Sequence, residues 1–205
     1  MGAYDRHVLP RLIDVVCRHP GFDRWRARAT EGLSGTVVEI GFGTGLNLRH
    51  YPDSVERILA VEPSIESRER AASRIAERGI PVDFVGLEGE SVPVDDDVAD
   101  FVLSTYTLCT IPGLAAALGE VRRMLRPGGT FHLLEHGLSA DDRVARWQHR
   151  LNPVENAIAG GCHLDRDIVP LVEDSGFTVD VIDQAYRLRP KVLGHITLAR
   201  ATPAA

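Results

Sequence analysis

Three glycines at alternate positions follow a short apolar run in the segment VVEIGFGTGLNLRHYP, residues 37–52. Gly41, Gly43 and Gly45 each cost chain entropy on folding, so the backbone must need to be bare at this point. The loop follows a predicted strand and precedes a helix-like stretch, where free amide groups and the helix dipole can hold a ligand. The pattern therefore predicts a strand–loop–helix unit with a ligand bound against the loop.

Short β-rich segments alternate with helix-periodic segments along most of the chain. Strands are predicted at residues 36–40, 57–62, 82–86, 99–104 and 130–136, and helices at residues 66–79 and 114–125. Such alternation is typical of βαβ units, so we expect an α/β fold, a doubly wound sheet with helices on both faces. Two later runs, 177–183 and 193–200, are predicted to close the sheet as an antiparallel pair, giving seven strands.

The 205 residues fit one domain. Within it we expect an N-terminal helical lid over residues 1–33, which could also be a packed extra helix, and a cofactor-binding core over residues 34–137. Substrate-side helices and the closing strands would occupy residues 138–205. One of those helices is predicted around residues 141–149, and another between an N-cap at Asp165 and a C-cap at Gly176.

Charge and cysteine content exclude several classes of function. The net charge of −6 argues against a nucleic-acid partner, because phosphate neutralisation needs clustered basic residues. The three scattered cysteines are typical of a reducing compartment, and the chain shows no signal peptide and no apolar stretch approaching the ~20 residues of a membrane span. We therefore expect a cytoplasmic protein without stable membrane insertion, and its oligomeric state stays open.

The glycine spacing excludes two common nucleotide loops. The dinucleotide fingerprint needs a glycine at the sixth position from Gly41, where this chain has Leu46. No Gly-Lys-Ser/Thr sequence follows, so the loop is not a phosphate-binding loop either. The spacing favours a ligand that carries no phosphate.

Two acidic residues flank this loop. Glu62 ends the second predicted strand, where an acid in a doubly wound sheet accepts hydrogen bonds from a ribose. Glu39 lies inside the first strand, and a buried carboxylate there needs a partner such as an ammonium group or a pair of backbone amides. A ribose, an ammonium group and no phosphate together describe S-adenosylmethionine.

The ordered segments VVEIGFGTG, AVEPS, GLEGESVP, ADFVLSTYTLCTI and LRPGGTFHLLEHG resemble the motifs of class I S-adenosylmethionine-dependent methyltransferases over roughly residues 36–137. The resemblance implies a Rossmann-like fold and S-adenosylmethionine as cofactor. Glu39 would then orient the loop and the methionine end, and Glu62 would hold the ribose hydroxyls, with Pro63 against the adenine. The residues that would line the methionine and ribose are Gly41, Phe42, Gly43, Thr44 and Gly45.

The same resemblance implies contacts from later segments. Glu88 and Gly89 stand where the family contacts the adenine edge, with Glu90 just beyond. The backbone carbonyls of Ser104 and Thr105, at the end of the fourth strand, would accept hydrogen bonds from the methionine ammonium.

The acceptor of the methyl group should lie beyond the carboxyl ends of the strands. This location favours Tyr106 and Thr107 after the fourth strand and His136 after the fifth. His136 is a candidate base or acceptor-orienting group, because histidine titrates near neutrality; a structural hydrogen bond is the alternative. His132, inside the fifth strand, is expected to be packed.

The segment GGCHLDR, residues 160–166, is the second unusual stretch. Cys162 and His163 are adjacent, but no second Cys/His pair at metal-ligand spacing accompanies them, so we expect no metal site. A tight turn that closes the acceptor pocket, with His163 facing inward, is the favoured interpretation. Cys109 is expected to be a small buried apolar residue.

The tail motifs over residues 147–166 are similar to the methyltransferase type 11 branch that includes thiol S-methyltransferases and phospholipid and quinone methyltransferases. The resemblance implies methyl transfer to a small-molecule acceptor, with a thiol slightly preferred and a pocket bounded by Tyr106, Trp147 and the N-terminal helix. O-, N- or C-methylation of a phenol, quinone, amine or phospholipid headgroup stays open. A non-catalytic S-adenosylmethionine-binding module is a further alternative, while Leu46 disfavours a nicotinamide oxidoreductase. The apolar N-terminal anchor of the membrane-associated members is not expected in this chain.

Overall fold

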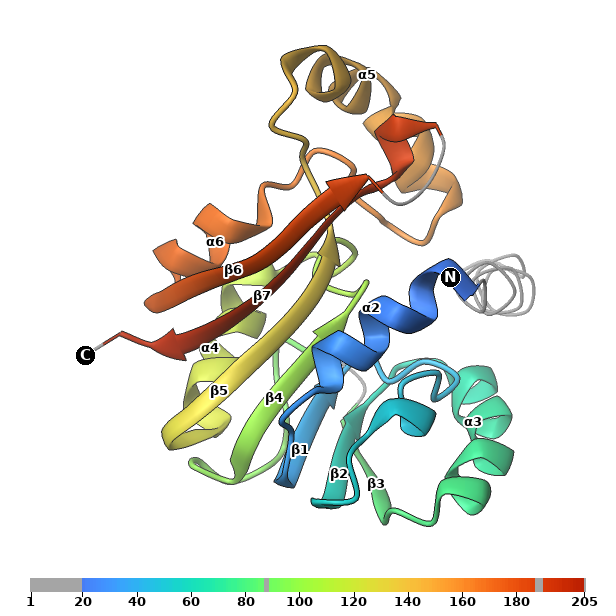
Figure 1. Cartoon of the computed structure of the whole chain (residues 1–205), viewed down its shortest axis with the longest axis vertical. Helices are drawn as coiled ribbons and strands as arrows, with labels where there is room; N and C mark the ends of the chain where they lie inside the picture. The colour runs from blue at the N-terminus through green and yellow to red at the C-terminus, as the bar shows by residue number, and fades with distance from the viewer. Residues whose placement is uncertain (1–19, 87–88, 187–189, 205) are drawn as a thin grey trace.

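The computed structural model describes residues 20–86, 89–186 and 190–204 (Figure 1). Its strands form one seven-stranded sheet in the order β3-β2-β1-β4-β5-β7-β6. The strands are β1 (Gly35–Ile40), β2 (Val55–Val61), β3 (Val82–Gly86), β4 (Ala99–Thr105), β5 (Leu125–His136), β6 (Phe177–Tyr186) and β7 (His195–Pro203). β1 to β5 pair in parallel, and β7 runs antiparallel to both β5 and β6. The predicted α/β fold and its antiparallel closing pair are confirmed.

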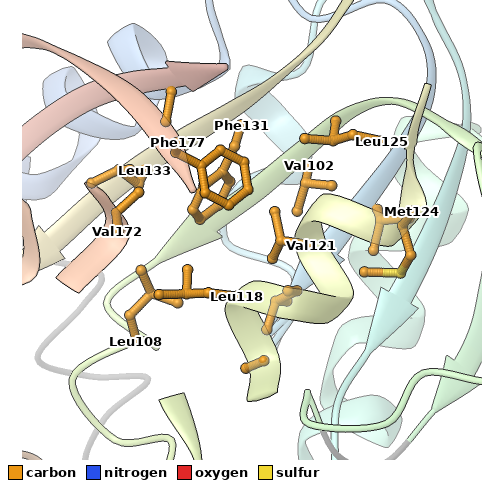
Figure 2. Packing of buried hydrophobic residues seen from close by; sticks show 14 of the residues in the cluster. Val102, Leu108, Leu118, Val121, Met124, Leu125, Phe131, Leu133, Val172 and Phe177 are labelled. Atoms are coloured by element: carbon orange, nitrogen blue, oxygen red, sulfur yellow. The ribbon is translucent and has the colours of Figure 1, made fainter. Parts of the chain in front are cut away.

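Helices cover both faces of the sheet, as Figure 1 shows. They are α2 (Pro20–Thr30), α3 (Ile65–Arg78), α4 (Leu114–Met124), α5 (Asp142–Ile158) and α6 (Ile168–Asp174), with short 3-10 turns η2 (Leu48–His50) and η3 (Lys191–Leu193). α2 and α3 contribute Trp25 and Ala71 to one apolar cluster. α4 and α6 contribute Leu118 and Val172 to the other, which Figure 2 shows packed around Phe131 of β5. The sheet is therefore buried on two sides, which explains the apolar runs of its central strands.

Three predicted boundaries are wrong. α6 begins at Ile168 with Asp167 at the N-cap position, not Asp165, because the Arg166 carbonyl accepts a hydrogen bond from Leu138 and holds this segment as a loop on the end of β5. The helix expected around residues 141–149 continues to Ile158 despite an internal proline. β5 begins at Leu125, five residues earlier than predicted at residue 130, since Leu125 pairs with Ala99 of β4.

The carboxyl ends of β1 and β4 lie side by side. Ile40, the last residue of β1, pairs with Ser104 of β4, so the glycine loop and the segment after β4 meet at one edge of the sheet. α5 lies beyond the carboxyl end of β5 at the same edge (Figure 1). Among the described helices, none combines the length and the apolar character that crossing a membrane requires.

Candidate active site at the carboxyl edge of the sheet

The glycine loop has a left-handed backbone. Gly41, Gly43 and Gly45 have φ angles of 74°, 58° and 75°, values that side-chain-bearing residues rarely adopt. A Cβ atom on Gly41 would lie 2.0 Å from Oγ1 of Thr107, so Gly41 also allows the loop to touch the segment after β4. A Cβ on Gly43 would meet only a backbone oxygen at 3.9 Å. One side of the loop is packed, and the backbone at Gly43 is open to a ligand.

Glu39 is fully buried in β1, and its carboxylate is held by two side chains. Asn47 Nδ2 donates to one oxygen at 2.6 Å, and the Tyr51 hydroxyl donates to the other at 2.7 Å. Burial raises the pKa of Glu39 to about 7 against the effect of these two hydrogen bonds. The partners are therefore neither an ammonium group nor a backbone amide pair, and Glu39 fixes the position of Asn47 behind the loop.

Arg26 of α2 is a functional candidate that sequence reasoning missed. It is 5% exposed, and its Nη1 donates to Asn47 Oδ1 at 2.7 Å and to Thr105 Oγ1 at 2.9 Å. Its Nε is buried with no hydrogen-bond partner among the described residues. The only sequence signal was a basic residue within an amphipathic segment, which is ordinary on a helix surface. Arg26 brings a buried cation to the junction of β1 and β4.

Glu62 bridges the glycine loop and the start of α3. Its two carboxylate oxygens accept from the backbone amides of Gly43 at 2.8 Å and Ser64 at 2.7 Å. Burial raises the pKa of Glu62, and these two hydrogen bonds oppose the shift. Each oxygen keeps a second lone pair, so the group can still accept two hydroxyl donors. Pro63 and Ile65 beside it are exposed, Ile65 to 68%. The two side chains form an apolar surface, here called the apolar shelf, whereas the sequence predicted an apolar contact for the adenine from Pro63 alone.

Three of the other predicted cofactor residues have structural partners. The Phe42 ring is 2% exposed and packs edge-to-face against Phe84, so only its backbone can line a ligand. Thr44 is buried, and its carbonyl accepts from Arg74. Glu90 accepts from the Gly113 amide at 2.9 Å, at the N-terminus of α4.

Gly89 is packed closely, since a Cβ there would lie 3.3 Å from Ile40. Glu88 and residues 1–19 of the predicted N-terminal lid lie outside the described residues. The adenine-edge predictions at Glu88, Gly89 and Glu90 therefore stay predictions.

Ser104 and Thr105 end β4 and are both buried. The Ser104 hydroxyl donates to Glu135 at 2.6 Å, and the Glu135 carboxylate also accepts from the Thr107 amide at 3.0 Å. Burial raises the pKa of Glu135 to about 7. Sequence reasoning passed over Glu135, which holds the turn after β4 in place from the neighbouring strand.

Tyr106 adopts a φ of 57°, an uncommon conformation for a residue with a side chain. Its amide donates to the Leu134 carbonyl at 2.8 Å, and its ring packs edge-to-face against Phe22 at 5.3 Å. The Arg26 guanidinium lies 5.2 Å from the same ring. Backbone strain of this kind gathers at functional sites, which supports the predicted position of Tyr106 at the acceptor.

His136 ends β5 and is brought together with both described cysteines. Its Nδ1 lies 3.9 Å from Cys162 Sγ, and its Nε2 is buried with no partner among the described residues. Cys109, in the loop after β4, is 3% exposed, and Cys162, between α5 and α6, is partly exposed. One ligand-type atom from each of the three lies within 4.8 Å of the others. A hydrogen bond from Cys109 and the proximity of His136 lower the pKa of Cys162 to about 5, while the pKa of Cys109 is raised.

His163 is partly buried beside this region, and Trp147 is exposed on α5. The His163 ring contacts Asn156 of α5 at 3.1 Å, and its amide donates to the Cys109 carbonyl at 2.9 Å. The backbone of the GGCHLDR segment is thus joined to the loop after β4. Trp147 is 54% exposed on α5, with Arg150 5.4 Å from its ring, and its place at the acceptor pocket stays a prediction. His132 is buried against the Ala29 carbonyl at 2.8 Å, as predicted.

These groups fit S-adenosylmethionine. Glu62 retains lone pairs for two ribose hydroxyls, and the open backbone at Gly43 lies beside it. The buried, unpartnered Nε of Arg26 suits a carboxylate, and the exposed Ile65 and Pro63 suit an adenine face. A doubly wound sheet with these groups at its carboxyl edge is typical of proteins that bind a nucleoside cofactor.

Comparison with known proteins identifies the family. Residues 38–133 match the family described as Methyltransferase domain. Thiol S-methyltransferase TMT1A of Homo sapiens is 33% identical over 72% of this chain and 62% of its own length. Phosphatidylethanolamine N-methyltransferase of Cereibacter sphaeroides is 26% identical over 78% of each chain. The chain thus spans about three fifths of the length of the thiol S-methyltransferases that it matches.

Solved structures show the same fold. The YcgJ protein of Bacillus subtilis superposes with a TM-score of 0.73 at 17% identity, covering 89% of this chain and 98% of that chain. A possible histamine N-methyltransferase of Thermotoga maritima, described as dependent on S-adenosylmethionine, gives 0.69 at 21% identity, with 96% and 99% covered. Residues 38–133 therefore form an S-adenosylmethionine-dependent methyltransferase domain.

Proposed function

We propose that this protein transfers the methyl group of S-adenosylmethionine to a small-molecule acceptor, with a thiol as the preferred class. The observation that carries the proposal is His136 Nε2, which is buried at the carboxyl edge of the sheet with no hydrogen-bond partner in the described part of the chain. A buried polar atom without a partner is costly, so this nitrogen is suited to an acceptor group bound beside it. The 33% identity to a thiol S-methyltransferase supports the choice of a thiol.

The donor would lie across the glycine loop. Glu62 binds the ribose hydroxyls, and the apolar shelf at Ile65 and Pro63 receives the adenine. Arg26 binds the methionine carboxylate through Nε, while the carbonyls of Ser104 and Thr105 accept from the ammonium. This arrangement directs the sulfonium toward the segment after β4, where Tyr106 begins the acceptor side.

The sulfonium is already activated, so the protein's main task is to align the acceptor with the methyl carbon. An acceptor thiol gives its proton to His136 or to water as its sulfur attacks. The new carbon–sulfur bond forms as the old one breaks, and the electron pair of the broken bond stays on S-adenosylhomocysteine. A positioned base contributes about 10²–10⁴-fold to such a step.

The test is calorimetric titration with S-adenosylmethionine and S-adenosylhomocysteine, with NADH as the control ligand. The same sample is then assayed for S-adenosylhomocysteine release with thiols, phenols, amines and phosphatidylethanolamine. We expect binding of both adenosyl ligands, no NADH binding, and release that depends on a thiol. Release with phenols or amines alone would replace the thiol by that class. Binding without release from any acceptor would favour a non-catalytic binding module, and no binding would refute the proposal.

A further inference from the structure

Two cysteines and one histidine from three separate segments meet at the carboxyl edge of the sheet. Cys109 follows β4, His136 ends β5, and Cys162 lies between α5 and α6. No motif spacing links these positions, yet the fold brings one ligand-type atom of each within 4.8 Å of the others. The methyl-transfer steps proposed above use no cysteine, so the cluster needs its own explanation.

The separation of Cys162 Sγ and His136 Nδ1 is close to that in a tetrahedral metal site, and Cys109 lies within 4.8 Å of both. With zinc–sulfur bonds of about 2.3 Å and zinc–nitrogen bonds of about 2.0–2.1 Å, two tetrahedral ligands lie about 3.6 Å apart for a sulfur–nitrogen pair and about 3.8 Å for two sulfurs. The observed separation of Cys162 Sγ and His136 Nδ1 is 3.9 Å, so a shift of a few tenths of an ångström closes it. Two thiolates and a neutral imidazole are also the donor set that zinc and similar thiophilic cations prefer.

We propose that Cys109 Sγ, Cys162 Sγ and His136 Nδ1 bind a thiophilic divalent cation of the zinc type, whose fourth position takes the acceptor thiol. This inference deepens the proposed function and rests on it for the identity of the fourth ligand. Three protein ligands with one open position are the pattern of catalytic rather than structural zinc sites. The partial exposure of Cys162 gives the cluster an approach from solvent.

The site lies next to the proposed donor. Thr107, which would clash with any side chain at Gly41, is two residues before Cys109 in the same loop. Glu135, which binds the amide of Thr107, directly precedes His136 in β5. The cation would therefore stand at the end of the donor site where the methyl group is expected.

Metal binding explains how an acceptor thiol becomes nucleophilic near neutral pH. The thiol releases its proton to solvent when its sulfur takes the fourth position. That sulfur attacks the methyl carbon, the sulfonium carbon–sulfur bond breaks, and its electron pair stays on S-adenosylhomocysteine. The neutral thioether product is a weak ligand and leaves. Of the two proton routes given under the proposed function, this arrangement uses the one to water, because His136 Nε2 keeps its hydrogen and orients the acceptor as a hydrogen-bond donor.

The experiment is a titration of the reduced, metal-free protein with cobalt(II), followed by displacement with zinc. Cobalt bound to thiolates gives a near-ultraviolet charge-transfer band that cobalt bound only to nitrogen or oxygen lacks. The variants are Cys109→Ser and Cys162→Ser, and the control is Cys17→Ser, which removes the third cysteine of the chain. Because Cys109 is buried, the result for Cys109→Ser counts only if circular dichroism shows a native fold. If that variant does not fold, the test rests on Cys162→Ser, at the partly exposed cysteine.

We expect one equivalent of cobalt and of zinc in the wild-type protein and in Cys17→Ser. Each ligand variant should bind the cation at least about tenfold more weakly and should lose charge-transfer intensity. Loss of a residue that only hydrogen-bonds a metal ligand already weakens metal binding by about this much. No charge-transfer band in the wild type, or an equal band in both ligand variants, overturns the site. Oxidation of Cys109 and Cys162 to a disulfide without any metal binding by the reduced protein overturns it as well.

The outcomes also separate this inference from the proposed function. S-adenosylhomocysteine binding and thiol methylation by a protein that binds no metal would refute the cation site alone. Metal binding without S-adenosylhomocysteine binding would refute the methyltransferase function and leave the cation site in place. Equal rates of thiol methylation before and after chelation would overturn the role of the cation in acceptor binding.

Discussion

The carboxyl edge has two halves: the proposed donor half, with the glycine loop, Glu39 and Glu62, and the proposed acceptor half, with Tyr106, His136 and Cys162. They differ in how their polar groups are paired within the chain. On the donor half, both oxygens of Glu39 and both oxygens of Glu62 have hydrogen-bond partners at 2.6–2.8 Å. On the acceptor half, His136 Nε2 has none among the described residues, and Cys162 is partly exposed beside it. The carboxylates of the donor half are preorganised, and Arg26 Nε is its buried nitrogen without a partner among the described residues, whereas the acceptor half presents His136 Nε2 and a partly exposed thiol at the proposed reaction centre.

Backbone strain follows the same division. The donor loop reaches its left-handed conformation with glycines, where that conformation costs little. The acceptor half adopts the left-handed conformation at Tyr106, where it costs a residue with a side chain about 1 kcal/mol or more. The proposed donor half thus has a relaxed backbone at its glycines, and the strained residue lies on the side where the chemistry is proposed.

The sharpest way to break this comparison is His136→Gln. If the acceptor half performs the chemistry, the variant should keep its affinity for S-adenosylhomocysteine and lose about 10²-fold or more in kcat, because it loses the positioned imidazole. Calorimetry measures the affinity, and S-adenosylhomocysteine release with the best acceptor measures kcat.

The matched control is His149→Gln, at an exposed histidine of α5 that pairs with Asp165 at 3.1 Å. This variant should behave as the wild type in both assays. An unchanged kcat in His136→Gln would remove His136 from the chemistry, and lost affinity for S-adenosylhomocysteine would show that the two halves are not separable.

The difference between the halves also explains what the sequence could predict. The glycine loop and Glu62 are local features, since a strand, a loop and the end of the next strand carry the whole pattern. The partners of Glu39 were missed because Asn47 and Tyr51 become its neighbours only when the turn η2 folds under the strand.

On the acceptor half, tertiary contacts determine which residues come together, so sequence patterns do not predict the site. Cys109 and Cys162 have no pairwise spacing that signals a site, and only the fold places them against His136. Arg26 is equally invisible, because a helical arginine is ordinarily exposed and this one is buried by its contacts with Asn47 and Thr105. Sequence patterns therefore predicted the sheet and the donor loop well, and the composition of the acceptor half poorly.

The rigidity of the donor half is tested by Gly41→Ala. Its backbone has a φ of 74°, and the new Cβ would lie 2.0 Å from Thr107 Oγ1. The added strain and clash should lower the free energy of unfolding by about 3 kcal/mol, as overpacking combined with an unfavourable φ does. Urea denaturation followed by circular dichroism measures the change.

Gly79→Ala is the matched control, because Gly79 has nearly the same φ of 73° but nothing within 4 Å of its would-be Cβ. We expect a loss of about 1 kcal/mol there, from the φ alone. Equal losses at the two glycines would mean that the contact with Thr107 is not tight, and the two halves would then be less closely joined than described.

Donor recognition is tested by Glu62→Ala. Removal of two charge-assisted hydrogen bonds to the ribose, and of the carboxylate that braces Gly43 and Ser64, should weaken S-adenosylhomocysteine binding by about 2 kcal/mol, or about 30-fold. Glu66→Ala, in the first turn of α3, is the control and should leave affinity unchanged. Comparable losses in both variants would point to a general weakening of α3 instead of ribose recognition.

The smallest expected effect concerns the proton on Glu39. Burial holds the pKa of Glu39 at about 7, above its ordinary value of 4.5. Between these two pH values the folded protein keeps a proton that the unfolded chain has lost. The free energy of unfolding therefore falls as pH rises through this window. Glu39→Gln removes this contribution, so the free energy of unfolding of the variant should fall less steeply than that of the wild type between pH 5 and pH 7.5.

Burial also raises the pKa of Glu135 to about 7. Glu135 is unchanged in the Glu39→Gln variant, so part of the decrease in the free energy of unfolding with rising pH remains. Urea denaturation at each pH measures both proteins, and Glu135→Gln gives the complementary slope from the acceptor half. Parallel pH profiles for Glu39→Gln and the wild type would mean that the carboxylate is already charged in the folded protein. The hydrogen bonds from Asn47 and Tyr51 would then outweigh its burial, and the donor half would hold a fixed negative charge behind the glycine loop.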